Sequence, residues 1–294
     1  MTVAPADLAV LAAPVARRRG MRAYIRRHPT IIIGGALLAV MAALAIFAPY
    51  LGTVDPQALA PVQRLRWPSA AHWFGTDMLG RDIYSRTIYG ARVSLTVGLS
   101  VALLASGFGL VIGLVTGFSR WTDAIVMRIM DGLMSIPPVL IAIALMALTR
   151  ASLQNVIIAI TVADAPRVTR LVRGVVLSLR ELPFVEAAYA SGTGFFRILG
   201  RHILPNTIPP LLVQGTFSAA SAMIVEAILS FLGAGTPPNI PSWGNIMAEG
   251  RSLFQVAYYI VFFPGAFLSI TVLAMNLLGD GLRDALDPRL ARRM

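Results

Sequence analysis

The sequence predicts an all-α membrane protein with six spans, and three observations lead to this prediction. Of 294 residues, 56% are hydrophobic and only 13% are charged, and the mean hydropathy is +0.73, whereas about 25% of residues in a soluble domain are charged. Apolar runs of roughly 20 residues, the length of a membrane span, recur along the chain. Arginines cluster between these runs, which is typical of cytoplasmic flanks.

The first predicted span, residues 30–51, follows an arginine-rich N-terminal tail, residues 1–29. This arrangement looks like a signal peptide. However, the apolar run is about as long as a full span, whereas the core of a cleavable signal has only about 7–15 residues. We therefore expect a retained signal anchor with the N terminus in the cytoplasm.

The next segment, residues 52–93, is the longest polar stretch, and we expect it outside the membrane on the extracytoplasmic side. It contains two pairs of opposite charges spaced four positions apart, Asp77 with Arg81 and Asp82 with Arg86. Such pairs stabilise a helix surface locally. We expect them on an amphipathic interfacial helix rather than in contact with a substrate.

A membrane core, residues 94–282, and a short C-terminal tail, residues 283–294, complete the predicted organisation. Eighteen of the 25 arginines fall in segments that this organisation places in the cytoplasm or near the cytoplasmic ends of the adjoining spans, so both termini are predicted there. The five further predicted spans are residues 94–118, 124–148, 152–172, 207–232 and 257–278.

Small residues and helix breaks interrupt the apolar runs. Four glycines in the second run predict close contact with another helix, because they let backbones approach; they are Gly107, Gly109, Gly113 and Gly117. Pro137 and Pro138 predict a kink in the third run, since proline removes a backbone hydrogen bond. The kink could serve packing or line a water-filled transport path.

Glu226 is the most notable residue inside a predicted span, because an ionised carboxylate at that depth is expensive unless it is paired, protonated or wet. With Pro137 and Pro138 it forms our candidate pathway or interhelix polar site.

A polar island, EAAYASGTGFFRILGRHILP, occupies residues 186–205. Gly192 and Gly194 interrupt helix formation, because glycine has low helix propensity and readily adopts a left-handed cap conformation. We expect two short helices with a bend between them. Pro205 is expected to break the second helix.

This motif resembles the cytoplasmic E-A-A loop of permease subunits in ABC importers, in which three residues separate E-A-A from a glycine and L-P closes the loop. The R-H-x-L-P ending is similar to the form in dipeptide, oligopeptide and nickel importers. In those permeases the loop is a coupling helix that sits in a cleft of a separate ATPase. The resemblance implies these coupling residues: Glu186, Ala187, Ala188, Gly192, Arg197, Arg201, Leu204 and Pro205.

Other stretches resemble peptide-importer permeases over most of the chain after residue 73. They are FGTDMLGRDIYSR at residues 74–86, EAILSFLG at residues 226–233 and GDGLRDALDPR at residues 279–289. One departure is ADAP at residues 163–166, where the family often has an aromatic residue before the proline.

The resemblance implies the type I ABC importer permease fold, with a cytoplasmic coupling loop within residues 174–206. It also implies one half of a multi-pass inner (plasma) membrane pathway for short peptides, with nickel or another small solute as an alternative cargo. The implied partners are a second homologous permease, two ATP-binding cassette subunits, an extracytoplasmic substrate-binding protein and membrane lipid. ATP and Mg would bind to the ATPase subunits and not to this chain.

No catalytic motif is evident, so we expect a transport subunit rather than an enzyme. The sequence contains no lysine, which excludes the phosphate-binding loop G-x-x-x-x-G-K-[ST]. The three histidines are far apart and there is no cysteine, so no metal site is predicted. Nucleic acid is not an expected partner, because the arginines flank apolar runs.

A second class of function remains open, namely a secondary transporter or channel driven by an ion gradient. Glu226 and Asp164 would then be proton or cation sites.

Overall fold

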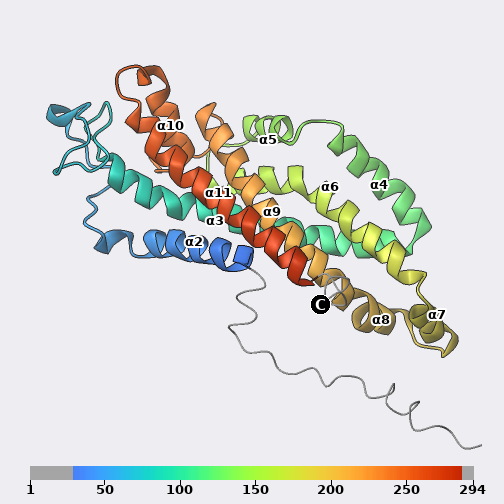
Figure 1. Cartoon of the computed structure of the whole chain (residues 1–294). Helices are drawn as coiled ribbons and strands as arrows, with labels where there is room; N and C mark the ends of the chain where they lie inside the picture. The colour runs from blue at the N-terminus through green and yellow to red at the C-terminus, as the bar shows by residue number, and fades with distance from the viewer. Residues whose placement is uncertain (1–28, 287–294) are drawn as a thin grey trace, which may run out of the picture.

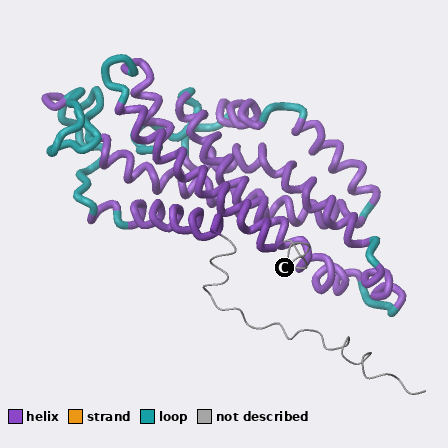
Figure 2. The backbone as a smooth tube through the Cα atoms, viewed as in Figure 1, coloured by secondary structure: helices purple, strands orange, loops and turns teal. Residues whose placement is uncertain are grey.

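The computed structural model describes residues 29–286 as an elongated bundle of helices (Figure 1). Most of the loop structure gathers at one end of this bundle (Figure 2). The α-helices are α2 (Pro29–Ile46), α3 (Ile83–Phe118), α4 (Arg120–Met134), α5 (Pro138–Ala147), α6 (Leu153–Arg180), α7 (Pro183–Ala190), α8 (Phe195–Ile198), α9 (Leu204–Phe231), α10 (Trp243–Gly250) and α11 (Tyr259–Leu286). Short 3-10 turns form η2 (Ala48–Tyr50), η3 (Pro61–Gln63) and η5 (Arg251–Leu253), and η4 (Leu199–Ile203) is a π-helical turn.

Each of the six predicted spans coincides with helical structure. Within residues 29–286, four helices are long and apolar enough to cross a membrane, or five if the bent pair α4–α5 counts as one span. α6 coincides with the remaining predicted span. It is less apolar because Asp164, Arg167 and Arg170 fall within its first 18 residues.

Several predicted boundaries need correction. α3 begins at Ile83, so residues 83–93 belong to a long helix and not to the polar segment. Asp82 caps this helix by accepting a hydrogen bond from the Ser85 backbone NH at 2.8 Å. α6 continues to Arg180, so the predicted loop 174–206 starts inside a helix. The first 28 and last eight residues of the chain, which contain most of the predicted tails, lie outside the described residues.

The third predicted span is two helices rather than one kinked helix. α4 ends at Met134, α5 begins at Pro138, and the two helices are bent by 89°. At the first position of a helix the backbone NH has no partner within the helix, so proline, which lacks this NH, is well tolerated there. This explains why α5 begins at Pro138. The predicted break at Pro137 and Pro138 is therefore confirmed, and it is sharper than a kink.

Close packing of α3 on α6 organises the centre of the bundle. A Cβ atom at Gly113 would lie 2.7 Å from the Val172 Cβ, and one at Gly117 would lie 2.6 Å from the Val176 Cβ. Gly109 makes the same kind of approach to Val168. The predicted glycine contact is thus confirmed at three positions. It is wrong for Gly107, where a Cβ would meet no described atom of another element within 4 Å.

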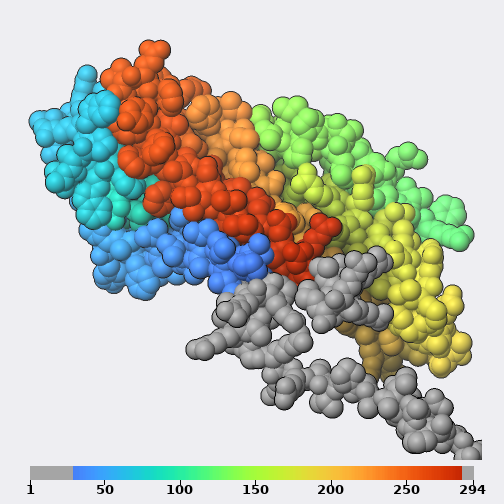
Figure 3. All heavy atoms as spheres, viewed as in Figure 1, coloured from blue at the N-terminus to red at the C-terminus, as the bar shows by residue number. Residues whose placement is uncertain are grey.

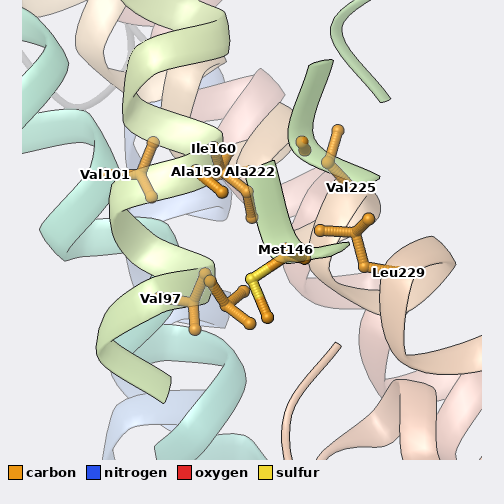
Figure 4. Packing of buried hydrophobic residues seen from close by; sticks show 10 residues of the cluster. Val97, Val101, Met146, Ala159, Ile160, Ala222, Val225 and Leu229 are labelled. Atoms are coloured by element: carbon orange, nitrogen blue, oxygen red, sulfur yellow. The ribbon is translucent and has the colours of Figure 1, made fainter. Parts of the chain in front are cut away.

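The largest apolar core joins α3, α5, α6 and α9 beside this contact (Figure 4). Buried members from these four helices include Val97, Met146, Ile160 and Leu229. α2 and α4 lie on opposite sides of the bundle (Figures 1 and 3). None of residues 120–134 in α4 is buried within this chain.

We expect Gly113→Leu to destabilise the protein by about 1–3 kcal/mol, because an added side chain would overlap the Val172 Cβ. Gly107→Leu is the matched control on the same helix, since it has free space. Thermal unfolding of the detergent-solubilised protein, followed by size-exclusion chromatography, measures both changes. Equal losses at the two positions would contradict the packing described above.

Candidate functional site

The E-A-A motif lies at the end of the bundle opposite the loop-rich polar segment (Figure 1). The chain leaves α6, forms α7, turns, and returns through α8 and η4 into α9. We call residues 183–203, from the start of α7 to the end of η4, the α7–η4 unit. It is the bent pair of short helices that the sequence predicts.

Local sequence explains the bend. α7 has a proline at its first position, where the missing NH costs no helical hydrogen bond. Gly192 has φ +72°, a left-handed conformation that favours glycine after a helix end. The Thr193 backbone NH donates to the Ala188 carbonyl at 3.0 Å and closes the turn. Gly194, at φ −65°, then precedes the first residue of α8.

Apolar packing fixes the unit to the bundle. Three of its side chains, Val185, Ile198 and Ile203, are completely buried. They belong to one cluster with Ala105 of α3 and with the α6 residues Val168, Val172 and Val176. Since these three valines are the same ones that contact the α3 glycines, α3, α6 and the unit are packed as one body.

The predicted coupling residues are mostly accessible in this chain. Ala188 and Leu204 are half-buried. The exposed ones are Glu186, Ala187, Gly192, Arg197, Arg201 and Pro205. The structure thus brings all eight onto or beside one projecting unit, and six of them are available to another molecule.

Exposed aromatic side chains accompany these residues. Phe196 is 84% exposed, and Phe184, Tyr189 and Phe195 are 43–47% exposed. Clustered exposed aromatic groups with nearby arginines are typical of a protein-binding surface. The exposed aromatic and arginine side chains of the α7–η4 unit are therefore suited to binding a partner protein.

The predicted break at Pro205 is wrong. The helical path continues from Phe195 to Phe231 as a single candidate span, and Pro205 lies in the first turn of α9. The π-helical turn η4 comes directly before it and changes the hydrogen-bonding pattern where proline provides no NH. The unit is therefore continuous with α9.

Glu226 is fully buried in α9 and holds neighbouring segments together. Ser230 donates to its Oε1 at 2.9 Å, and Ser94 of α3 lies 3.4 Å from its Oε2. Ser230 also accepts from the Thr236 backbone NH at 3.2 Å. Asn245 of α10 in turn donates to the Thr236 hydroxyl at 3.0 Å. This network joins α3, α9, the following loop and α10.

Pro137 and Pro138 do not share this environment. Both are exposed at the α4–α5 break, whereas Glu226 has no exposed surface. The three residues proposed together from sequence therefore do not form one polar site. Glu226 has the features of an interhelix polar residue.

Sequence reasoning missed an ionic cluster on the loop-rich end. Asp77 and Arg81 lie in a loop, so the predicted interfacial helix is wrong. Asp77 accepts from Arg81 and Arg86 at 2.6 Å, and Glu249 of α10 accepts from the same two arginines at 2.5 Å. The local spacing identified the Asp77–Arg81 pair. The predicted Asp82–Arg86 pair is wrong, because Arg86 is paired with Asp77 and Glu249 while Asp82 caps α3. No sequence signal pointed to Glu249.

Sequence reasoning also missed the charge pairs between α4 and α6. Arg173 of α6 is paired with Asp123 of α4, with Nη2 to Oδ2 at 2.7 Å. Arg170 of α6 is paired with Asp131 of α4. The only available signal was that arginines recur every three residues along an apolar helix.

Comparison with known proteins is consistent with this architecture. Residues 107–292 match the family model described as binding-protein-dependent transport system inner membrane component. A probable peptide ABC transporter permease protein of Sinorhizobium fredii is 54% identical over 268 residues, covering 91% of this chain and 92% of that protein. A dipeptide transport system permease of Alkalihalophilus pseudofirmus is 43% identical, covering 90% of this chain and 88% of that protein.

Among solved structures, the inward-facing MetNI methionine ABC transporter has a TM-score of 0.49 and 24% identity over 66% of this chain and 94% of the other. The family match covers more than half of this chain, and both relatives align over nearly all of it. This chain therefore belongs to the family of inner membrane components of binding-protein-dependent transport systems, the permeases of ABC importers.

Proposed function

We propose that this chain is a permease subunit of an ATP-driven importer and forms half of a membrane pathway for short peptides. The observation that carries the proposal is the 54% identity, over almost the whole chain, to a probable peptide ABC transporter permease. The dipeptide permease relative supports the same cargo. A second permease and an extracytoplasmic binding protein would complete the pathway, and two ATPase subunits would bind ATP and Mg.

The α7–η4 unit is the proposed docking surface for an ATPase subunit. It exposes small, aromatic and basic residues while its buried side chains remain fixed to α6. It also continues directly into α9. Movement of the ATPase would therefore displace α6 and α9 together as a rigid body, which is how an interface change becomes a domain movement.

We further propose that the α7–η4 unit and both termini face the cytoplasm, with residues 52–82 on the other side. The arginine distribution supports this orientation. This orientation also requires the α7–η4 unit and residues 52–82 to lie at opposite ends of the bundle, as they do (Figure 1).

Cysteine labelling tests this orientation, because the chain has no native cysteine. Ser69 and Ser191 are both exposed. In intact cells, a membrane-impermeant thiol reagent should label Ser69→Cys and leave Ser191→Cys unlabelled. Disrupted cells are the control, in which both should react. The reverse pattern in intact cells would contradict the proposed orientation.

Gly192→Val should reduce peptide uptake by about fivefold or more and weaken ATPase stimulation by loaded binding protein. A β-branched residue is strained at φ +72° by at least about 1 kcal/mol and would reshape the turn. Uptake and ATP hydrolysis of the reconstituted transporter are the measurements.

Gly194→Val is the matched control, because that position has a negative φ and a Cβ would meet no described atom within 4 Å. Near-normal uptake is expected for this control. If Gly192→Val is also near normal, the turn does not act in coupling.

The Glu226 network bears on the ion-gradient alternative. The carboxylate accepts from Ser230 and Ser94, and Ser230 links it to the segment before α10. These contacts fit a role in holding helices together, which needs hydrogen bonding more than a mobile charge.

Glu226→Gln should therefore retain most uptake, because the amide oxygen can still accept from Ser230. Glu226→Ala should lose more, with a stability cost of about 1–3 kcal/mol from unsatisfied buried hydroxyls. ATP-driven uptake and thermal stability are measured in vesicles with the ion gradient collapsed. Loss of uptake on collapsing the gradient, together with an inactive Gln variant, would support an ion-driven carrier instead.

A further inference from the structure

Along the half of α6 nearest the α7–η4 unit, one face remains polar and uncovered. Arg167, Arg170, Gly174 and Ser178 are all exposed and lie at helical spacings of three or four residues. We call these four residues the polar stripe. The exposed residues in the other half of α6 include Ile158 and Val162. Apart from Gln154 in its first turn, α6 therefore exposes apolar side chains in one half and polar groups in the other.

The position of this stripe restricts what can cover it. Arg167 lies 14 residues, or roughly 21 Å, from the start of α6 and five residues from the cytoplasmic end of the predicted fourth span, residues 152–172. Its side chain is 51% exposed, and that of Arg170 is 49% exposed. Charged groups inside a span face a water-filled cavity, a polar protein surface or, near the end of the span, the membrane interface, rather than the hydrocarbon.

Three of the four arginines in this half of α6 differ in how firmly α4 or α6 carboxylates hold them; the fourth, Arg180, donates to the Gly117 carbonyl. Arg173 and Arg170 are hydrogen-bonded to Asp123 and Asp131 of α4. Arg167 has only a 3.6 Å approach from its Nη1 to the Asp164 Oδ1. The other Asp164 oxygen already accepts from Ser218 of α9 at 2.5 Å.

The Arg167 guanidinium is thus the one with the most unused hydrogen-bonding capacity. Arginine carries five donors in a planar fork that matches a carboxylate. The stripe then leads from Arg167 past Gly174, where a Cβ would meet no described atom within 4 Å, towards the α7–η4 unit.

We infer that the polar stripe lines the aqueous translocation path in the assembled transporter, and that Arg167 binds the terminal carboxylate of the passing peptide. This inference rests on the proposed peptide-import function. Arg167 would be the first arginine that a solute meets on this face when moving towards the α7–η4 unit.

Labelling of cysteine variants tests access to water. Arg167→Cys and Gly174→Cys are introduced into the complete transporter in proteoliposomes, with Val162→Cys as the control on the apolar half of α6. Charged methanethiosulfonate reagents should modify the Arg167→Cys and Gly174→Cys variants but not the Val162→Cys variant. The mass of the permease chain measures the modification. Absence of modification at both stripe positions would mean that the partner permease or lipid covers the stripe, which would overturn the inference.

Chemical rescue tests the carboxylate contact. Arg167→Cys should lower dipeptide uptake by about tenfold, because a charge-assisted contact is lost. A 2-aminoethyl reagent, which restores a positive charge, should recover much of the uptake, whereas a 2-sulfonatoethyl reagent should not. Arg167→Lys should also retain more uptake than Arg167→Gln. A structural role through the Asp164 carboxylate would also favour the positive reagent, so uptake of a dipeptide is compared with uptake of its C-terminal amide: only a contact with the peptide carboxylate makes the effect of the reagents disappear for the amide.

Equal effects of the two reagents would overturn the carboxylate role. If the Arg167→Cys variant does not assemble, uptake by Arg167→Lys compared with Arg167→Gln tests the carboxylate contact. Labelling of Gly174→Cys then tests whether water reaches the polar stripe. Labelling does not require transport, so it still reports on water access if the unmodified transporter fails to import dipeptides. Failure to import dipeptides would reject the proposed function, and the carboxylate role with it, whatever the labelling shows.

Discussion

The α3 and α6 backbones approach each other closely in the centre of the bundle, and both the apolar core and the α7–η4 unit pack against this pair. Gly109, Gly113 and Gly117 allow the α6 valines to approach the α3 backbone, where larger residues would separate the helices. The same valines pack against the buried side chains of the α7–η4 unit. One face of α6 thus connects the centre of the membrane bundle with the surface proposed to receive the ATPase.

Polar contacts join segments that are distant in sequence. Glu226 connects α9 with α3 and, through serine and threonine hydroxyls, with α10. At the loop-rich end, Asp77 and Glu249 share Arg81 and Arg86. Buried groups of this kind are stable only when their partners are present, because a single missing partner leaves an uncompensated polar group. These networks fix α10 and the long loop relative to α3.

Two sides of the chain are incomplete without other molecules. The α7–η4 unit exposes aromatic and basic side chains, and α6 exposes Arg167 and Arg170 within the predicted fourth span. Lipid hydrocarbon is not expected to cover either surface. The unit lies at an end of the bundle, beyond the spans, and the α6 arginines are charged. An assembled transporter, with a docked ATPase and a wet path, accounts for both surfaces.

Four features could be predicted from the chain alone: the all-α membrane fold, the approximate positions of the helices, the break at Pro137 and Pro138, and the bend at Gly192. They depend on local composition and backbone chemistry, which can be read along the chain. Three others became visible only in the folded protein: Gly107 is not packed, Pro205 continues a helix, and Glu249 and Asp131 are partners of distant arginines. The reason is physical: such contacts depend on how helices pack in three dimensions, and spacing within one helix does not determine which residue of another helix lies opposite.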